Sequence, residues 1–165
     1  MQLLSTTDMV KRISESWSFV SGTSFEFRES DHRSTIADHE NMMAVILPMY
    51  IDSLPHRESI AIGLILDDTE AVKVAAHMFG LTPETLSVAD IQDAKKETCN
   101  ILGGNLVVGE NSKLGLPREI PLAEFLELQK NATFSMLFVS DKPNEDLVNL
   151  VIFNVNNESS GEFLS

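Results

Sequence analysis

Length, composition and charge limit the classes of protein and of partner that fit this chain. It has 165 residues, 43% of them hydrophobic, and a formal net charge of −13 at pH 7. That length and that hydrophobic share fit one globular domain and exclude a disordered chain. The negative charge repels nucleic acids and anionic membrane surfaces, so we expect neither as a partner.

The termini and the cysteine content indicate a cytoplasmic protein. The N-terminus lacks the basic residues of a secretory signal, and the longest apolar stretches are far shorter than the ~20 residues that a membrane helix requires. The one cysteine, Cys99, excludes an internal disulfide, and the four scattered histidines give no metal-ligand spacing. We therefore predict one domain over residues 1–156, a polar tail at 157–165, and no metal or other cofactor of the chain's own.

The first elements are predicted to be a helix and a short strand. Apolar residues at helical spacing run to about Ser21, with Thr6 or Thr7 as the cap and Gly22 as the stop. Two phenylalanines then alternate with polar neighbours at 25–27, which predicts a short strand. A polar loop is expected after it.

A hairpin and a second helix come next. Met42–Tyr50 and Ser59–Leu66 are nearly continuous apolar runs, typical of strands that are covered on both faces. Pro48 predicts that the first of these strands ends near a sheet edge, because proline has no N–H to donate. The acidic residues at 67–69 predict the cap of a helix that stops at Gly80.

The second half predicts another hairpin. Leu114–Ile120 is expected to be a short strand or an extended link, and Leu122–Lys130 has a brief helical period. Ala132–Val139 and Asp146–Phe153 are apolar runs joined by a loop rich in turn-forming residues, which predicts two antiparallel strands.

Residues 87–106 form an amphipathic helix around which the chain is organised. Its apolar positions recur at three- and four-residue spacing and face a core: Ile91, Ala94, Thr98, Ile101 and Leu102. A second, polar stripe faces outward: Asp90, Asp93, Glu97, Asn100 and Gly104. Ser87 is a natural N-cap, and Asp90 gives an imperfect capping box. Gly103 and Gly104 leave room on the helix for something to approach.

The pattern Asp93-x-x-x-Glu97-x-x-Asn100 followed by Ile-Leu-Gly-Gly resembles the signature helix of the CheC/CheX/FliY family of chemotaxis phosphatases. The single good copy of the Glu-x-x-Asn element is more similar to CheX than to two-site CheC. The family also has a proline after this helix, for which Pro117 and Pro121 are both candidates. The resemblance implies a CheC-like fold and a homodimer.

The two halves of the chain resemble each other. Each predicts a helix, an extended piece and a hairpin, and residues 15–22 can be laid on residues 97–104 without a gap. This overlay pairs Ser18 with Asn100 and Lys11 with Asp93. We therefore expect an α/β fold with a mostly antiparallel sheet of about six strands, long helices packed on one face, and a pseudo-two-fold internal repeat with one decayed site. Chance similarity between two amphipathic helices is the alternative.

The resemblance implies a reaction and a role for each site residue. The partner would be a phosphorylated CheY-like receiver domain, which carries both the phosphoryl aspartate and its Mg²⁺. Asn100 would orient the attacking water, because its amide can accept and donate without adding negative charge. Glu97 would dock by pairing with a lysine of the receiver. Asp93, Gly103 and Gly104 would support them, while Lys95 and Lys96 are either contacts for an acidic patch or solvated charge.

Other readings of these residues stay open. A polar stripe on a long helix is often only a solvated face. The chain would then be a non-enzymatic binding module that recognises a receiver domain or a flagellar-switch protein, or a dimeric domain with an unrelated ligand. Cys99 lies between Glu97 and Asn100, but no histidine is near in sequence, so we predict a small buried thiol rather than a nucleophile.

Overall fold

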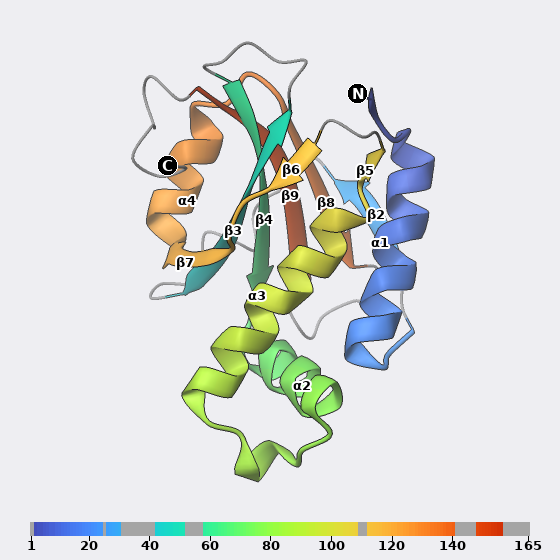
Figure 1. Cartoon of the computed structure of the whole chain (residues 1–165), viewed down its shortest axis with the longest axis vertical. Helices are drawn as coiled ribbons and strands as arrows, with labels where there is room; N and C mark the ends of the chain where they lie inside the picture. Colours follow the sequence, from blue (N-terminus) through green and yellow to red (C-terminus); the bar gives the residue numbers. More distant parts are fainter. Residues whose placement is uncertain are drawn as a thin grey trace.

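The computed structural model describes residues 2–24, 26–30, 42–51, 58–108, 112–140 and 148–156, and Figure 1 labels most of the helices and strands that they form. The helices are α1 (Thr6–Ser21), α2 (Asp68–Phe79), α3 (Val88–Gly104) and α4 (Leu122–Lys130), with a single 3₁₀ turn η1 at Pro83–Thr85. The strands are β1 (Gln2–Leu3), β2 (Phe27–Ser30), β3 (Met43–Ile51), β4 (Glu58–Leu66), β5 (Val107–Val108), β6 (Ser112–Leu114), β7 (Arg118–Pro121), β8 (Ser135–Ser140) and β9 (Val148–Asn156). Phe25, most of the predicted loop after β2 and the predicted tail at 157–165 lie outside the described residues.

The main sheet is antiparallel throughout and has the strand order β2-β8-β9-β4-β3, with β6 and β7 both paired to the outer edge of β3. Both predicted hairpins, β3–β4 and β8–β9, are confirmed. The order is palindromic: β4 and β9 lie in the middle, β3 and β8 flank them, and β2 and the β6–β7 pair lie outside. Each half therefore supplies the outer strand of the other half, which is the expected pseudo-two-fold repeat.

The long helices α1 and α3 pack on one face of the sheet, as expected, and α2 packs against both of them. Their buried side chains share one core with every second residue of the central strands, such as Leu47, Ile62 and Leu150. At ~25 cal/mol per Å² of apolar surface removed from water, this core is the main source of stability. Figure 1 shows α1 and α3 running in opposite directions along this face.

The opposite face of the sheet is covered by α4. The brief helical period at 122–130 predicted this helix but not the face on which it packs. The Phe125 ring lies on Gly63 of β4, where an added Cβ would overlap it, and meets Phe153 edge to face at 5.4 Å between centroids. The alternate residues of β3, β4 and β9 form a second core there. Cover on both faces explains why these strands are apolar at almost every position.

The helix ends follow the local sequence. Ser5, not Thr6 or Thr7, is the N-cap of α1, since its hydroxyl accepts from the Asp8 N–H at 3.3 Å. Gly22 ends α1 with a φ of 72°, a backbone conformation that glycine adopts at little cost.

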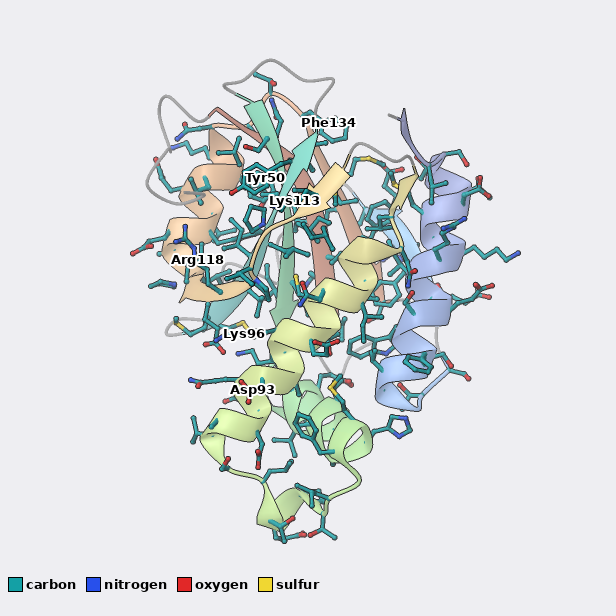
Figure 2. The ribbon with its side chains drawn as sticks, in the orientation of Figure 1. Tyr50, Asp93, Lys96, Lys113, Arg118 and Phe134 are labelled. Atoms are coloured by element: carbon teal, nitrogen blue, oxygen red, sulfur yellow. The ribbon has the colours of Figure 1, made fainter. Side chains whose placement is uncertain are left out.

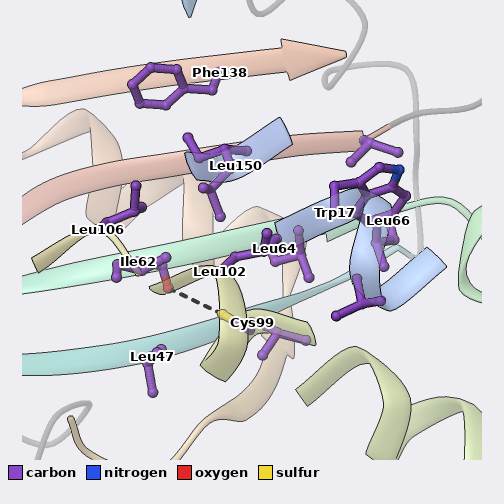
Figure 3. Close-up of a cluster of buried hydrophobic side chains, with 14 of the residues drawn as sticks. Trp17, Leu47, Ile62, Leu64, Leu66, Cys99, Leu102, Leu106, Phe138 and Leu150 are labelled. Carbon is purple, nitrogen blue, oxygen red and sulfur yellow. Dashed lines mark hydrogen bonds between the residues drawn. The ribbon is translucent and has the colours of Figure 1, made fainter. Parts of the chain in front are cut away.

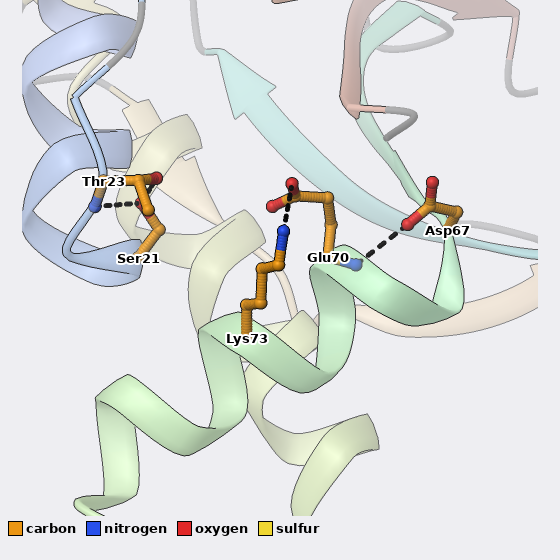
Figure 4. Close-up of polar contacts among 5 residues, drawn as sticks. All are labelled: Ser21, Thr23, Asp67, Glu70 and Lys73. Atoms are coloured by element: carbon orange, nitrogen blue, oxygen red, sulfur yellow. Dashed lines mark hydrogen bonds and ion pairs between the residues drawn. The ribbon is translucent and has the colours of Figure 1, made fainter. Parts of the chain in front are cut away.

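The acidic cap predicted for α2 is confirmed. The carboxylate of Asp67 accepts from the Glu70 N–H at 2.8 Å, as Figure 4 shows. The Glu70 carboxylate, in a side chain that is only 2% exposed, lies 3.8 Å from the ammonium of Lys73 one turn later. Gly80 ends this helix, also with a positive φ.

Pro48 lies in the middle of β3 and not near its end, which corrects the sequence prediction. On one side it pairs with Ala61 of β4. On the other side β7 pairs with Met43–Ile46 and β6 with Met49–Ile51, so Pro48 falls where one neighbour gives way to the next. The missing N–H costs no ladder bond there. Its carbonyl still accepts from the Gly115 N–H at 2.8 Å.

Candidate functional site

The candidate site lies on α3, whose first turn is fixed by a complete capping box. The Ser87 hydroxyl accepts from the Asp90 N–H at 3.0 Å, and the Asp90 carboxylate accepts from the Ser87 N–H at 2.9 Å. The sequence predicted an imperfect capping box, because Asp90 stands where Glu is usual. The structure shows that both hydrogen bonds of the box are formed. Because both interactions close the same turn, the start of the helix and the rotation of all later side chains are defined.

The buried face of α3 is made of small and medium-sized side chains. These are Ala94, Thr98, Cys99, Leu102 and Gly103. Figure 3 shows Cys99 and Leu102 of this face beside Leu47 and Ile62 of the sheet. The Thr98 hydroxyl donates to the Ala94 carbonyl at 2.7 Å, so its polar group is satisfied within the helix. This face holds α3 in place without large side chains.

Cys99 is fully buried, as predicted. Its thiol lies 4.0 Å from the Ile62 carbonyl of β4, the contact drawn in Figure 3. Burial raises the pKa of the Cys99 thiol far above its ordinary value, because the thiolate would lose its solvation. The neutral thiol is therefore a packing group and not a nucleophile.

The polar stripe of α3 faces outward, as expected from its spacing. The side chains of Asp93 and Glu97 are exposed, and that of Asn100 is partly exposed. Glu97 and Asn100 are three residues apart, so they are neighbours on the helix surface. The arrangement presents one carboxylate and one amide side by side on a rigid support.

The two glycines of α3 have different surroundings, and one differs from the expectation. Gly103 is buried, and a Cβ added to it would lie 2.8 Å from both Ile62 Cδ1 and Leu47 Cδ2. Its missing side chain therefore lets α3 approach the sheet and leaves no room for a partner. Gly104 is exposed, with only Leu114 Cδ1 at 3.7 Å from such a Cβ. Gly104 alone keeps the outward face bare.

The two lysines of α3 also differ from each other. The ammonium of Lys95 lies 3.6 Å from the carboxylate of Glu119 in β7, and the two side chains are only 12% and 13% exposed. This is an ion-pair distance and too long for a hydrogen bond. The pair joins the middle of α3 to the edge of the sheet. Lys96 is half-buried beside the stripe, and Figure 2 shows it on the side of α3 that faces Arg118.

A groove between α1 and α3 borders the stripe on its other side. It has a volume of about 650 Å³ and is lined by Asp8, Lys11, Arg12, Glu15, Ser16, Phe19, Ile101 and Asn105. The Asn105 amide donates to the Ser16 hydroxyl at 2.7 Å, and the Arg12 guanidinium donates to the Asn105 carbonyl at 3.3 Å. Sequence reasoning missed this groove, because only the packing of the two helices creates it.

The remaining sequence candidates are not part of α3. Pro117 is in the link before β7, and Pro121 is the last residue of β7 and the N-cap of α4. Among the residues that the structure describes, no group of three histidine, cysteine or acidic side chains could hold a metal ion. Within the same ranges, no helix is both long enough and apolar enough to cross a bilayer.

Solved structures share this fold across almost the whole chain. CheX from Borrelia burgdorferi, solved as a complex with CheY, BeF₃ and Mg²⁺, has a TM-score of 0.67 at 13% identity, over 94% of this chain and all of that one. A CheC-like superfamily protein from Shewanella sp. PV-4 has a TM-score of 0.60 at 8% identity, over 90% and 95% of the two chains. Chemotaxis protein CheX from Vibrio vulnificus has a TM-score of 0.55 at 12% identity, over 90% and 93%.

Sequence comparisons add nothing to this. No model of a protein family matches the chain, and no curated protein does. The likeness to the solved structures thus lies in the fold and not in the sequence. The chain has the fold of the CheC and CheX chemotaxis proteins.

Proposed function

We propose that this chain is a phosphatase that accelerates hydrolysis of the aspartyl phosphate in a CheY-like receiver domain. The observation that carries the proposal is the pair Glu97 and Asn100, which lies on the outward face of a capped helix in a chain with the CheX fold. The receiver would bring the phosphoryl group and its Mg²⁺. This chain would bring the groups that place the water.

Asn100 suits the role of water positioning. In hydrolysis the water oxygen bonds to phosphorus on the side opposite the aspartyl oxygen, whose bond to phosphorus breaks to release inorganic phosphate. The Asn100 carbonyl oxygen can accept from that water, and its NH₂ can donate to a phosphoryl oxygen. A neutral amide does both without adding negative charge next to the phosphate. Fixing the water in line accounts for the acceleration.

Glu97 suits the role of docking. Its carboxylate is exposed and lies one helical turn before Asn100, so a lysine of the receiver that pairs with Glu97 would set the position of Asn100 over the phosphoryl group. Asp93, one turn earlier on the same face, would extend this acidic edge. Homodimer formation remains a prediction from the family resemblance.

The test is the decay of a phosphorylated receiver from the same cell, measured by phosphate release with and without this chain. We expect faster decay with the wild-type chain, no acceleration with Asn100→Ala, and weaker binding with Glu97→Ala. Gln92→Ala is the matched control, because it removes an exposed amide from the same helix outside the stripe.

The results of this test distinguish the phosphatase from the non-enzymatic binding module. Full activity of both Asn100→Ala and Glu97→Ala would show that the assigned site is wrong. Binding of a receiver without any acceleration would instead support the non-enzymatic binding module.

A further inference from the structure

Two strongly exposed apolar side chains flank the stripe of α3. Among the described residues, the large hydrophobic side chains that are more than 70% exposed are Phe19 at 75%, Val88 at 73% and Leu116 at 85%. Val88 is at the far N-terminal end of α3. The other two lie beside the middle of the stripe, on opposite sides.

Phe19 lies on the α1 side. The helices α1 and α3 run in opposite directions, and Ser16 of α1 contacts Asn105 after α3. The turn of α1 that follows Ser16 therefore lies beside the turn of α3 that precedes Asn105. Phe19 and Ile101 occupy those turns, and both line the groove between the helices. Ile101 directly follows Asn100 on α3, so the phenyl ring borders the stripe near the level of Asn100.

Leu116 lies on the opposite side, in the link between β6 and β7. Leu114, before it, reaches to 3.7 Å from where a Cβ of Gly104 would be, and Glu119, after it, pairs with Lys95. The link therefore runs along α3 from Gly104 toward Lys95, which puts Leu116 near the level of Asn100.

The backbone beneath Leu116 is fixed. The Gly115 N–H donates to the Pro48 carbonyl at 2.8 Å, and a Cβ on Gly115 would lie 2.7 Å from Pro48 Cγ. In Figure 2 the labelled Lys113 and Arg118 mark the two ends of this link beside α3. A rigid base under an exposed leucine is the arrangement that an interface anchor requires.

The stripe alone is too small to hold a protein partner. A stable protein–protein interface buries roughly 800 Å² on each side and involves about 20–30 residues, whereas the stripe presents one face of four helical turns. A receiver that sits over Asn100 must therefore also contact the surfaces beside α3. In such an interface a few well-packed side chains near the centre carry most of the binding energy.

The charges beside the stripe fit such a partner. Although the chain has a net charge of −13, Lys96 of α3 and Lys113 of β6 lie on the side of α3 that faces the link, and the groove on the other side holds Lys11 and Arg12 together with Asp8 and Glu15. A phosphoryl group held among carboxylates is an acidic surface, and these cations complement it.

We propose that Phe19 and Leu116 are the apolar anchors that hold the receiver domain on both sides of Asn100, so that the docking surface extends from α1 across α3 to the β6–β7 link. This inference rests on the proposed function and assigns the contacts that select the receiver. The two side chains act on binding and leave the reacting atoms to Asn100.

The experiment measures the affinity for the beryllium-fluoride form of a receiver by calorimetry, and kcat and KM for release of phosphate from the phosphorylated form. Phe19→Ala and Leu116→Ala should each weaken binding and raise KM about tenfold, with kcat changed less than about twofold. Phe19→Leu and Leu116→Met should restore most of the affinity, because they keep apolar bulk. Val88→Ala, equally exposed but ~18 Å along the helix from Asn100, should change nothing.

The outcomes distinguish a failure of the anchors from a failure of the proposed function. If both alanine variants bind like the wild type while Asn100→Ala abolishes the acceleration, the anchors are wrong and the proposed function stands. If both variants convert a dimer into monomers, the surface belongs to a second copy of this chain. If no receiver binds the wild type, both proposals fail. Weaker binding of the alanine variants to a receiver that the wild type binds without accelerating its decay would keep the anchors and reject the enzyme.

Discussion

The helices α1 and α3 occupy equivalent places in the two halves and are built in opposite ways. Both begin with a serine N-cap and both pack on the same face of the sheet. In the overlay of the halves, Trp17 of α1 takes the place of Cys99 of α3, and both are completely buried. A large ring thus fills the space under one helix, while a thiol and a glycine bring the other helix down onto the strands. The same architecture accommodates either solution.

Their outward faces differ as well. Where α3 has Asp93 and Asn100, α1 has Lys11 and Ser18, although Glu15 matches Glu97. The helix that carries the candidate site is also the one whose buried face is made of small and medium-sized side chains. The two helices therefore differ in what their side chains do. Those of α1 mainly fill the core, whereas those of α3 present the candidate site on a closely packed helix.

The sharpest test of the difference in packing is Trp17→Ala. Its ring is completely buried and meets Phe27 edge to face at 6.1 Å between centroids, so its loss leaves a large cavity. We expect the free energy of unfolding, measured with urea, to fall by about 3–5 kcal/mol. A loss below ~1 kcal/mol would show that α1 collapses onto the sheet as α3 does.

The difference in chemistry is tested by Asn100→Ser, which gives α3 the residue that α1 has in Ser18. A hydroxyl is too short to hold the water in line from the same backbone position. We expect the stimulated phosphate release to fall about 100-fold, with receiver affinity and unfolding free energy unchanged. Retention of more than a third of the activity would mean that the α1 pattern is also competent.

The close approach of α3 is tested by a matched pair of glycine substitutions. Gly103→Ala puts a methyl group against Ile62 and Leu47, so we expect a loss of about 1–3 kcal/mol in unfolding free energy. Gly104→Ala, with open space around it, should instead be neutral or stabilising by up to ~1 kcal/mol, because alanine favours the helix. Urea unfolding of both variants decides. Equal effects would contradict the assignment of Gly103 to packing.

The buried thiol of Cys99 in α3 should make the free energy of unfolding depend on pH. Burial raises the pKa of its thiol in the folded state, so the folded chain keeps the proton that the unfolded chain loses above about pH 8.5. The stability that the neutral thiol contributes is therefore full below that pH and falls as pH rises above it, by up to about 1.4 kcal/mol per pH unit. The stability of Cys99→Ala should fall less steeply over the same range. Parallel curves for the two chains would contradict this.

The smallest expected effect concerns the contact that joins the two helices. Asn105→Ala removes the 2.7 Å hydrogen bond to Ser16 and leaves the backbone carbonyl that Arg12 contacts. We expect the unfolding free energy to fall by about 1 kcal/mol. An unchanged value would show that apolar packing alone sets the distance between α1 and α3.

Local sequence predicted much of this fold. Caps such as Ser87 and Asp67, stops such as Gly22 and Gly80, and the hairpins depend on residues close together in the chain, and they are formed as expected. The outward stripe of α3 also followed from spacing alone. Its identification as a site depended on the family resemblance, and the roles of Glu97 and Asn100 remain predictions.

The features that sequence reasoning missed depend on distant pairings. Pro48 led to the prediction of a nearby sheet edge, because the sequence around it does not show that β7 pairs with the first part of β3 and β6 with the last part. Gly103 pointed to an open surface because the side chains that crowd it come from β3 and β4. The groove with Phe19, and the place of Leu116 beside α3, arise only when elements far apart in sequence come together.

The palindromic strand order has a consequence for how such a chain can arise and be divided. Each half lends its outer strand to the other, so a polypeptide of half this length would leave strand edges open unless a second copy supplied the missing partner. A duplicated gene joined end to end would give this sheet from an ancestral pair of identical subunits. In such a joined chain the two copies would be free to diverge, so that one carries a polar surface while the other fills the interior.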